Sequence, residues 1–518
     1  MFTPHRKVIW FAVFSRLLIF FLSAAFNFIL PDHDADAFQS PRDPSDKEWS
    51  SLDDFVKYLF GGLVRWDAQY FIHIALYGYT YENCLAFFPL YPMSVRVLAV
   101  CLLYPLEGFI SHYSAFVLSS VVVNFIIFIL SASVLYRLGL QVLRSEQLAY
   151  KAAILYCVNP ATIFFVAPYS ETLFACLTFY GMLKCGSGST DHFSVGCGLP
   201  FGLGAVQRSN GILNLGFIFH KKLKHFLHFV MPGTKAKAKH LDSFLLAPLL
   251  LIAPVIYLIS LIGEILLSVI PFVLFQGYGY YKFCIVPDHN LPNFIVSYAE
   301  TNELRLPGTA SLKPPINHKE HWCNSSVPLA YSYIQDHYWN VGFLRYYQWK
   351  QIPNFLLAMP VVWIIFTYAY RFAKQHPHLC CTLGLWKDLS CTDTKVIEKL
   401  RVQMKQNKIK FAPEMFVYVV HVTFLTVFCI LCIHVQVTTR MIASSSPILY
   451  WFTAYHFSNK RRNVLEERVD SLENLQSRWK VFILTDPAPN REAKLIQYYY
   501  LAYFIVGTAL FSNFFPWT

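Results

Sequence analysis

The chain has 518 residues, of which 55% are hydrophobic, 17% aromatic and only 14% charged. Soluble domains carry about 25% charged residues, so this composition indicates a multi-pass membrane protein and excludes an ordinary soluble enzyme. The net charge of +12 comes from basic segments that lie between apolar runs. Such segments are typical of cytoplasmic loops of membrane proteins, so we expect no nucleic-acid partner.

The first apolar run, residues 8–30, follows Arg6 and Lys7 and is too long for the core of a signal peptide. We expect an uncleaved signal anchor with its N-terminus in the cytoplasm. Residues 31–110 would then form a first luminal segment. Its part 84–110 is apolar but contains prolines, so we expect it to lie at the interface or to re-enter the membrane without crossing it.

Further membrane spans are expected at about 112–136, 148–168, 195–219, 244–275, 352–371, 411–434, 441–458 and 496–515. The sequence therefore predicts an all-α fold of about eight to ten transmembrane helices, with 1–518 as a single domain. Alternating these spans places a large loop, 276–351, on the luminal side. It places the basic loops 372–410 and 459–494 in the cytoplasm.

Most of the 13 cysteines lie in apolar runs, where cysteine behaves as a small hydrophobic residue. Cys84, Cys284 and Cys323 fall on the predicted luminal side, where an oxidising environment allows a pairing among them. Asn324 begins an Asn-Ser-Ser sequon. Such tripeptides also arise by chance, but the luminal placement makes Asn324 a candidate for glycosylation.

Arg65, Trp66 and Asp67 form a charged and aromatic cluster just beyond the first span. One interpretation is an interfacial Trp beside an Arg–Asp pair that closes a loop. The other is that Asp67 is a general base for a hydroxyl group, with Trp66 as an apolar wall for a sugar ring. Arg65 would then bind Asp67 or a phosphate, and Gln69 would add a polar contact to the substrate.

Two charged residues lie in or near later apolar runs. Glu171 follows a proline-rich break, and a carboxylate there is costly unless it is paired or hydrated, so it marks a cavity or a structural pair. Arg208 is read as a charge that extends to the cytoplasmic border, in preference to a phosphate contact.

Gln276, His434 and Arg440 come from distant segments but fall on the same predicted membrane side as Asp67. There His434 and Arg440 could bind a phosphate leaving group. The chain contains no Walker loop, GxGxxG or HExxH motif, which disfavours a nucleotide-dependent enzyme. A donor carried by a lipid fits better.

An ordered set of motifs resembles the PIG-V family of GPI mannosyltransferases over residues 8 to about 515. The motifs are Arg65-Trp66-Asp67-Ala68, Phe87-Phe88-Pro89, Asn159-Pro160-Ala161, Phe164-Phe165, Tyr169-Ser170-Glu171, Arg208-Ser209-Asn210-Gly211, Pro271 to Gln276 ahead of Cys284, Tyr338 to Phe343, Pro353-Asn354-Phe355, and His434 to Val437 with Arg440.

The resemblance implies a type C glycosyltransferase (GT-C) fold with luminal interfacial helices, a luminal active site in the endoplasmic reticulum membrane, and importance for Trp66, Asp67, Gln276 and His434. It implies transfer of the second mannose, in α-1,6 linkage, from dolichol-phosphate-mannose to the first mannose of the glycosylphosphatidylinositol (GPI) precursor. A β-linked donor and an α-linked product imply inversion by single displacement, with Asp67 as base and Arg440 or His434 stabilising the departing phosphate.

Partners implied in this way are the GPI precursor, the lipid-linked donor and the lipids of that membrane, while the need for a small accessory membrane subunit stays open. No cofactor is expected, and no metal, because no clustered set of carboxylates is visible. Nothing catalytic is expected in the basic loops. Two other functions remain as alternatives: a transporter of lipids or solutes, suggested by the many spans, and a non-catalytic membrane scaffold.

Overall fold

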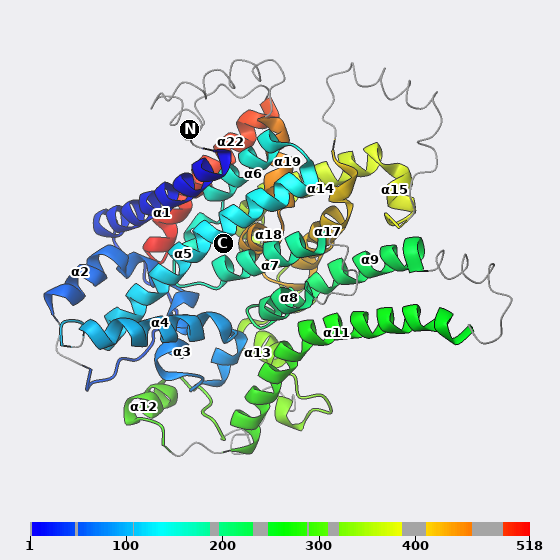
Figure 1. Ribbon diagram of the computed structural model, residues 1–518. Coiled ribbons are helices and arrows are strands. Elements are labelled where there is room, and N and C mark those ends of the chain that lie inside the picture. Colours follow the sequence, from blue (N-terminus) through cyan, green and yellow to red (C-terminus); the bar gives the residue numbers. More distant parts are fainter. Residues whose placement is uncertain are drawn as a thin grey trace.

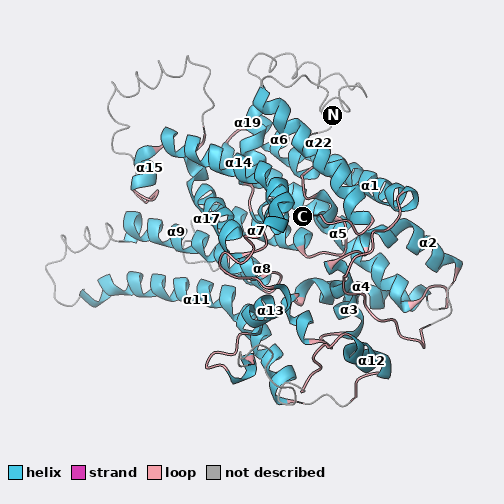
Figure 2. Ribbon diagram, turned by 180° about the vertical axis from the view of Figure 1, so that it is seen from behind, coloured by secondary structure: helices cyan, strands magenta, loops and turns pink. Residues whose placement is uncertain are grey.

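The computed structural model describes residues 3–46, 50–106, 108–186, 196–230, 247–286, 290–308, 321–385, 411–457 and 491–517. Within these ranges the regular structure is entirely helical, as the sequence predicts (Figure 2). The basic loops expected at 372–410 and 459–494 lie mostly outside the described residues.

Six helices among the described residues are long and apolar enough to cross a membrane. They are α1 (Pro4–Ile29), α5 (His112–Leu143), α11 (Ala247–Tyr280), α14 (Ile352–Gln375), α17 (Phe416–Cys432) and α22 (Arg491–Ser512). Shorter helices complete the described architecture: α2 (Ser51–Phe60), α3 (Asp67–Tyr77), α4 (Leu90–Leu106), α6 (Glu146–Cys157), α7 (Glu171–Gly186), α8 (Gly198–Ala205), α9 (Leu215–His225), α12 (Asn293–Thr301), α13 (Ala330–Trp339), α15 (Pro377–Cys381), α18 (Thr438–Ser445) and α19 (Ile448–His456).

Three of the expected spans are broken into shorter pieces. The run 148–168 becomes α6 and a short 3-10 helix, the run 195–219 becomes α8, a 3-10 helix and α9, and the run 441–458 becomes α18 and α19. Pro160 and Pro447 lie at two of these breaks. Proline interrupts a helix because it has no backbone N–H to donate and its ring clashes with the preceding turn. At the first break the side chain of Asn159 accepts a hydrogen bond from the N–H of Ala161, at 2.9 Å.

A buried arginine of α1 caps the C-terminal end of α6. Arg16 of α1 is fully buried and donates hydrogen bonds to the carbonyl of Cys157, at 2.7 Å, and to the hydroxyl of Thr162, at 2.6 Å. Its guanidinium also lies over the ring of Phe128, 3.8 Å from the centroid. The carbonyls at a helix C-terminus have no partner within the helix, so Arg16 satisfies groups that the break would otherwise leave unpaired in an apolar setting.

Helices α8 and α11 pack closely through two glycines of α8. A Cβ atom at Gly202 would lie 2.1 Å from the carbonyl oxygen of Leu267, and one at Gly198 would lie 2.9 Å from that of Glu264. This spacing of small residues, four apart on one face, allows two backbones in a membrane to approach each other. Figure 1 shows α11 beside α8 and α9, running out from the rest of the bundle.

Several short helices lie below α1 in the view of Figure 1. They include α2, α3, α12 and α13, together with the apolar helix α4, into which the expected interfacial segment 84–110 folds. Here Cys284 and Cys323 form a disulfide, whereas Cys84 is buried and free.

A buried carboxylate joins two of these short segments. Glu82 accepts hydrogen bonds from His321 at 2.6 Å, from the Trp322 indole at 2.9 Å and from Tyr338 at 3.0 Å. Burial alone would raise the pKa of Glu82, but the hydrogen bonds from His321 and Trp322 outweigh it and lower the pKa. Glu82 therefore holds the large loop 276–351 against the segment that follows α3.

Candidate active site

Asp67 begins α3, and the residue before it has an unusual backbone conformation. Trp66 has φ 54° and ψ −128°, a region that glycine enters freely and residues with a Cβ rarely adopt. The N–H of Asp67 donates a hydrogen bond to the Tyr169 hydroxyl, at 3.1 Å. The Trp66 ring packs edge-on against Phe514, with ring centroids 5.9 Å apart. This turn places Asp67 at the first position of α3, beside the Tyr169 hydroxyl.

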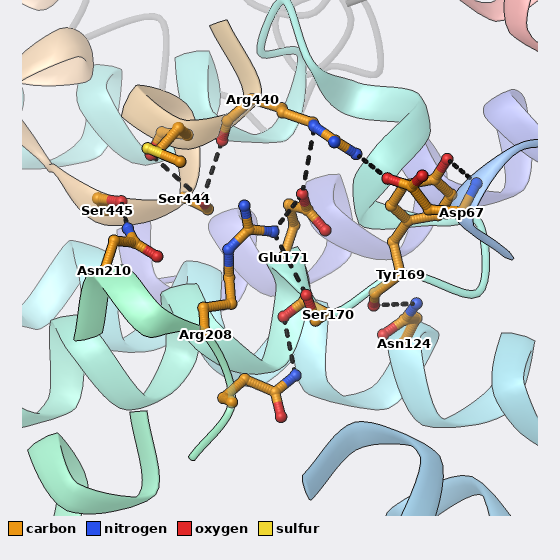
Figure 3. A network of polar contacts seen from close by, with 12 residues as sticks. Asp67, Asn124, Tyr169, Ser170, Glu171, Arg208, Asn210, Arg440, Ser444 and Ser445 are labelled. Atoms are coloured by element: carbon orange, nitrogen blue, oxygen red, sulfur yellow. Dashed lines mark hydrogen bonds and ion pairs between the residues drawn. The ribbon is translucent and has the colours of Figure 1, made fainter. Parts of the chain in front are cut away.

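The Asp67 carboxylate forms an ion pair with a residue almost four hundred positions later in the chain. Nη1 of Arg440, on α18, donates to Oδ2 of Asp67 at 2.9 Å (Figure 3). The guanidinium lies between the rings of Phe164 and Tyr169, 5.2 and 5.5 Å from their centroids. Burial tends to lower the pKa of Arg440, but the charges of Asp67 and Glu171 outweigh it and raise the pKa, so this side chain stays cationic.

A second carboxylate, Glu171, lies between two arginines. It is fully buried at the start of α7, and its Oε1 lies 3.8 Å from Nε of Arg440. The same oxygen receives a short hydrogen bond from Arg208, which also donates to the Ser170 hydroxyl at 3.3 Å. Figure 3 shows these side chains as a continuous chain of contacts from Asp67 through Arg440 and Glu171 to Arg208.

The four charges of this network balance. Asp67 and Glu171 each begin a helix, where the helix dipole stabilises a negative charge, and the two arginines supply two positive charges. Asp67 is one-third exposed, whereas the Glu171 side chain has no exposure. Only Asp67 is therefore open to an incoming substrate, and Glu171 is enclosed as a support for both arginines.

The structure corrects the interpretation of Arg208 as a charge at the cytoplasmic border. The predicted span 195–219 is broken, and Arg208 lies at the break with its guanidinium in the Asp67 network. Hydropathy alone could not place it, because the break depends on contacts between chain segments. Next to it, Asn210 donates to the Ser445 hydroxyl at 2.9 Å and so ties this break to α18, which carries Arg440.

Arg65 and Gln69, two neighbours of Asp67 that the sequence analysis assigns to substrate binding, point elsewhere. Nη2 of Arg65 pairs with Asp32 at 2.9 Å and bonds Asn27 at 2.8 Å. Gln69 donates to the carbonyl of Val64 at 3.0 Å and accepts from a loop N–H. Both residues fasten the Asp67 loop to its surroundings and do not join the ion-pair network.

Gln276 and His434 lie outside the ion-pair network as well. Oε1 of Gln276 accepts the N–H of Tyr331 in the first turn of α13, at 3.3 Å. His434 stacks on Tyr346, with ring centroids 4.6 Å apart. Burial lowers the pKa of His434, so a neutral imidazole is expected at neutral pH, which disfavours the role of a cationic phosphate ligand.

Sequence reasoning left Tyr169 out of the candidate site, although it supplies the hydroxyl that holds Asp67. The sequence feature that could have indicated Tyr169 is its place beside Glu171 in the motif Tyr169-Ser170-Glu171. Asn324, the glycosylation candidate, is exposed and lies beside the disulfide. No group of three or more His, Cys, Asp or Glu side chains suited to a metal ion occurs in the described part of the chain.

Comparison with known proteins gives full-length matches. The family model described as Mannosyltransferase (PIG-V) matches residues 5–518. The chain is 38% identical to "GPI alpha-1,6-mannosyltransferase 2" of Cricetulus griseus and 37% identical to that of Homo sapiens, with 99% of each chain covered. It is 34% identical to "GPI mannosyltransferase 2" of Drosophila melanogaster, covering 99% of this chain and 100% of the relative.

Among solved structures, the chain is similar to the archaeal oligosaccharyltransferase AglB from Archaeoglobus fulgidus in complex with an inhibitory peptide and a dolichol-phosphate. The TM-score is 0.41 at 11% identity, and the match covers 98% of this chain but 56% of that one. The GT-C fold class stays a prediction from the family resemblance.

Proposed function

The chain belongs to the mannosyltransferase (PIG-V) family, and on that premise we propose that Asp67 is the base with which it transfers mannose. It is an α-1,6-mannosyltransferase of GPI-anchor synthesis that adds the second mannose to the GPI precursor. The donor is dolichol-phosphate-mannose, and the reaction is a single displacement that inverts the anomeric carbon.

The chemistry assigned to Asp67 follows from its position. The 6-hydroxyl of the first mannose gives its proton to the Asp67 carboxylate while its oxygen attacks the anomeric carbon of the donor. The bond from that carbon to the phosphate oxygen breaks, and dolichyl phosphate leaves with the electron pair. Asp67 suits this role because it is the exposed carboxylate of the network, at the start of a helix and beside the Trp66 ring.

Arg440 is assigned to the phosphate of the donor. In the absence of substrate it is paired with Asp67 at 2.9 Å, so the ion pair occupies the carboxylate. An incoming phosphate competes for the same guanidinium, so donor binding releases the Asp67 carboxylate for the acceptor hydroxyl. Glu171 keeps Arg440 in place during this exchange, because it contacts the opposite edge of the guanidinium.

We place the protein in the endoplasmic reticulum membrane, with the N-terminus in the cytoplasm and Asp67 on the luminal side. Arg65, two residues before Asp67, pairs with Asp32 just beyond the C-terminal end of α1, which supports this orientation. The disulfide between Cys284 and Cys323 supports it too, since disulfides persist in oxidising compartments. The neighbouring sequon at Asn324 would then face the glycosylation machinery.

The observation that carries the assignment is the Asp67–Arg440 pair in a balanced network of two carboxylates and two guanidinium groups. The test is rescue of cells that lack this chain, with lipid-linked intermediates separated by chromatography. Wild type and Glu300→Gln, a change at an exposed carboxylate on α12, should remove the intermediate with one mannose, whereas Asp67→Asn should leave it. Rescue by Asp67→Asn at normal protein level would contradict the assignment and favour a scaffold or transporter.

A further inference from the structure

One tyrosine hydroxyl lies beside the ion-pair network without belonging to it. Tyr331 is in the first turn of α13, its side chain is partly buried, and its hydroxyl contacts that of Ser209. Ser209 directly follows Arg208 in the chain, and the positive charges of Arg208 and Arg440 both act on the Tyr331 hydroxyl. Tyr331 thus adds a hydroxyl group to the side of the site that carries the two guanidinium groups.

The position of Tyr331 is set by its ring and by its backbone. The ring packs edge-on against Phe88, with ring centroids 5.5 Å apart. The backbone N–H donates to Oε1 of Gln276, near the end of α11, at 3.3 Å. The first N–H groups of a helix have no partner within it, so Gln276 satisfies one of them and fixes the start of α13. Because a phenol ring is rigid, these two contacts also fix where the hydroxyl lies.

The other end of α13 is held as well. Tyr338 donates to the Glu82 carboxylate at 3.0 Å, and the Trp339 ring packs edge-on against Phe87, with ring centroids 6.0 Å apart. The His434 imidazole contacts the backbone of Trp339. Helix α13 is therefore fixed at both ends, and it presents Tyr331 to the arginines from a rigid element, which is what a precisely placed functional group requires.

The Tyr331 hydroxyl is suited to donate a hydrogen bond to an anion. Burial raises the pKa of Tyr331, against the opposing effects of Ser209 and of the two arginines, so the phenol keeps its proton at neutral pH. A hydrogen bond from such a phenol to a charged oxygen is stronger than one to a neutral oxygen. In the proposed reaction the phosphate of the lipid-linked donor gains negative charge as its bond to mannose breaks. A hydroxyl fixed beside the arginines would stabilise this charge as it develops.

We propose that the Tyr331 hydroxyl donates a hydrogen bond to the departing phosphate of the lipid-linked donor, beside Arg440, and that Gln276 is a positioning residue that acts through Tyr331. This inference rests on the proposed function, because it takes the donor to be a lipid-linked mannosyl phosphate. The electron pair of the broken bond stays on the phosphate oxygen. Tyr331 keeps its proton and shares it with that oxygen in the hydrogen bond.

The first test removes the hydroxyl and nothing else. Tyr331→Phe keeps the ring that packs against Phe88. Initial rates of mannose transfer by the full chain in vesicles are measured with each substrate varied in turn, and are normalised to the amount of folded protein. Loss of a hydrogen bond to a charged group lowers a rate by about 10-fold to 100-fold. The kcat/KM for the donor should therefore fall by about that factor, with the KM for the acceptor unchanged.

Tyr333→Phe is the matched control. Tyr333 is another partly buried tyrosine of α13, two residues further on and so on nearly the opposite side of the helix. The charges that act on its hydroxyl are those of Glu82 and Arg305, and not those of the arginines in the active site. Tyr333→Phe should therefore have wild-type kinetics for both substrates.

A double-mutant cycle tests the role of Gln276. Gln276→Met keeps the length of the side chain but removes the oxygen that accepts the Tyr331 N–H. If Gln276 acts through Tyr331, Gln276→Met should lower the kcat/KM for the donor in the wild-type background and add little further loss in the Tyr331→Phe background. Losses that multiply in the double variant would show that Gln276 acts independently of Tyr331, and would overturn its role as a positioning residue.

Two results would overturn the assignment of Tyr331. An unchanged kcat/KM for the donor in Tyr331→Phe would show that the hydroxyl does not serve the departing phosphate. A rise in the KM for the acceptor alone would show that the hydroxyl binds the acceptor and its phosphodiester instead. Either result leaves the proposed function standing as long as wild type transfers mannose and Asp67→Asn does not. Failure of wild type to transfer mannose would instead refute the proposed function.

Discussion

The strained backbone at Trp66 predicts that Trp66→Gly is more stable than Trp66→Ala, the reverse of the usual order for glycine and alanine. With φ 54° and ψ −128°, any residue with a Cβ at this position is strained, by about 1–3 kcal/mol, whereas glycine is not. At an ordinary helical or extended position glycine is instead less stable than alanine by about 0.5–1 kcal/mol. Trp66→Gly should therefore be more stable than Trp66→Ala by roughly 0–2.5 kcal/mol, with a central value of about 1 kcal/mol.

Both variants lack the indole, so its packing against Phe514 cancels in the comparison. The assay is the thermal unfolding midpoint of each purified variant in one detergent. A difference of 1 kcal/mol moves the midpoint by about 2–4 °C in a domain of 150–250 residues and by less in a longer chain. Ala68→Gly, at a buried helical position of α3, is the control. There alanine is the more stable residue, so the change to glycine should lower the unfolding midpoint. A Trp66→Ala protein as stable as Trp66→Gly would refute the claim of backbone strain.

The same pair of variants tests why a strained residue is present. Stability alone would favour glycine at position 66, so the tryptophan found there indicates that its side chain serves the reaction. Trp66→Gly should therefore retain the fold and lose mannose transfer. Full activity of Trp66→Gly would show that the indole is not needed to position the sugar.

Three further predictions follow from other parts of the fold. Gly202→Ala places a Cβ 2.1 Å from the carbonyl oxygen of Leu267 and should destabilise the protein by about 1–3 kcal/mol. Gly216→Ala, at a helical position of α9 with no atom within 4 Å, should not lower the unfolding midpoint. If Asn324 is luminal, glycosidase should shift the mobility of wild type but not of Asn324→Gln; a resistant wild type would speak against that placement. The pKa of Glu82 is lowered on folding, so its stabilisation is present above the unfolded-state pKa of about 4.3 and is lost as the pH falls through the folded value. The midpoint difference between wild type and Glu82→Gln should therefore be large at pH 7 and vanish well below pH 4, and a pH-independent difference would contradict this reasoning.

Hydropathy predicted the long helices but not the broken ones. The runs at α1, α5, α11, α14, α17 and α22 are long and apolar, and all six appear as single helices. The breaks within 148–168, 195–219 and 441–458 depend on hydrogen bonds between segments, such as those of Arg16 to Cys157 and Thr162. A window of single-residue hydropathies contains no information about such partners.

For the candidate site, the sequence predicted a shared membrane face, which stays a prediction, but it did not predict which side chains are in contact. Sequence reasoning placed Asp67, Gln276, His434 and Arg440 on one side, and the structure joins only Asp67 and Arg440. Which side chains meet depends on how the short helices turn, and no periodicity fixes that for a helix of eight residues such as α18. Arg65 shows the same limit, because the strained turn at Trp66 sends its side chain away from Asp67.

The most direct test of the account is the rate of mannose transfer in a single turnover, with donor and acceptor bound before the reaction starts. This measurement isolates the chemical step from binding. Asp67→Asn keeps the size of the side chain but removes its basicity, so the rate should fall by about 10²–10⁴. A single-turnover rate within tenfold of wild type would show that Asp67 does not accept the proton of the attacking hydroxyl.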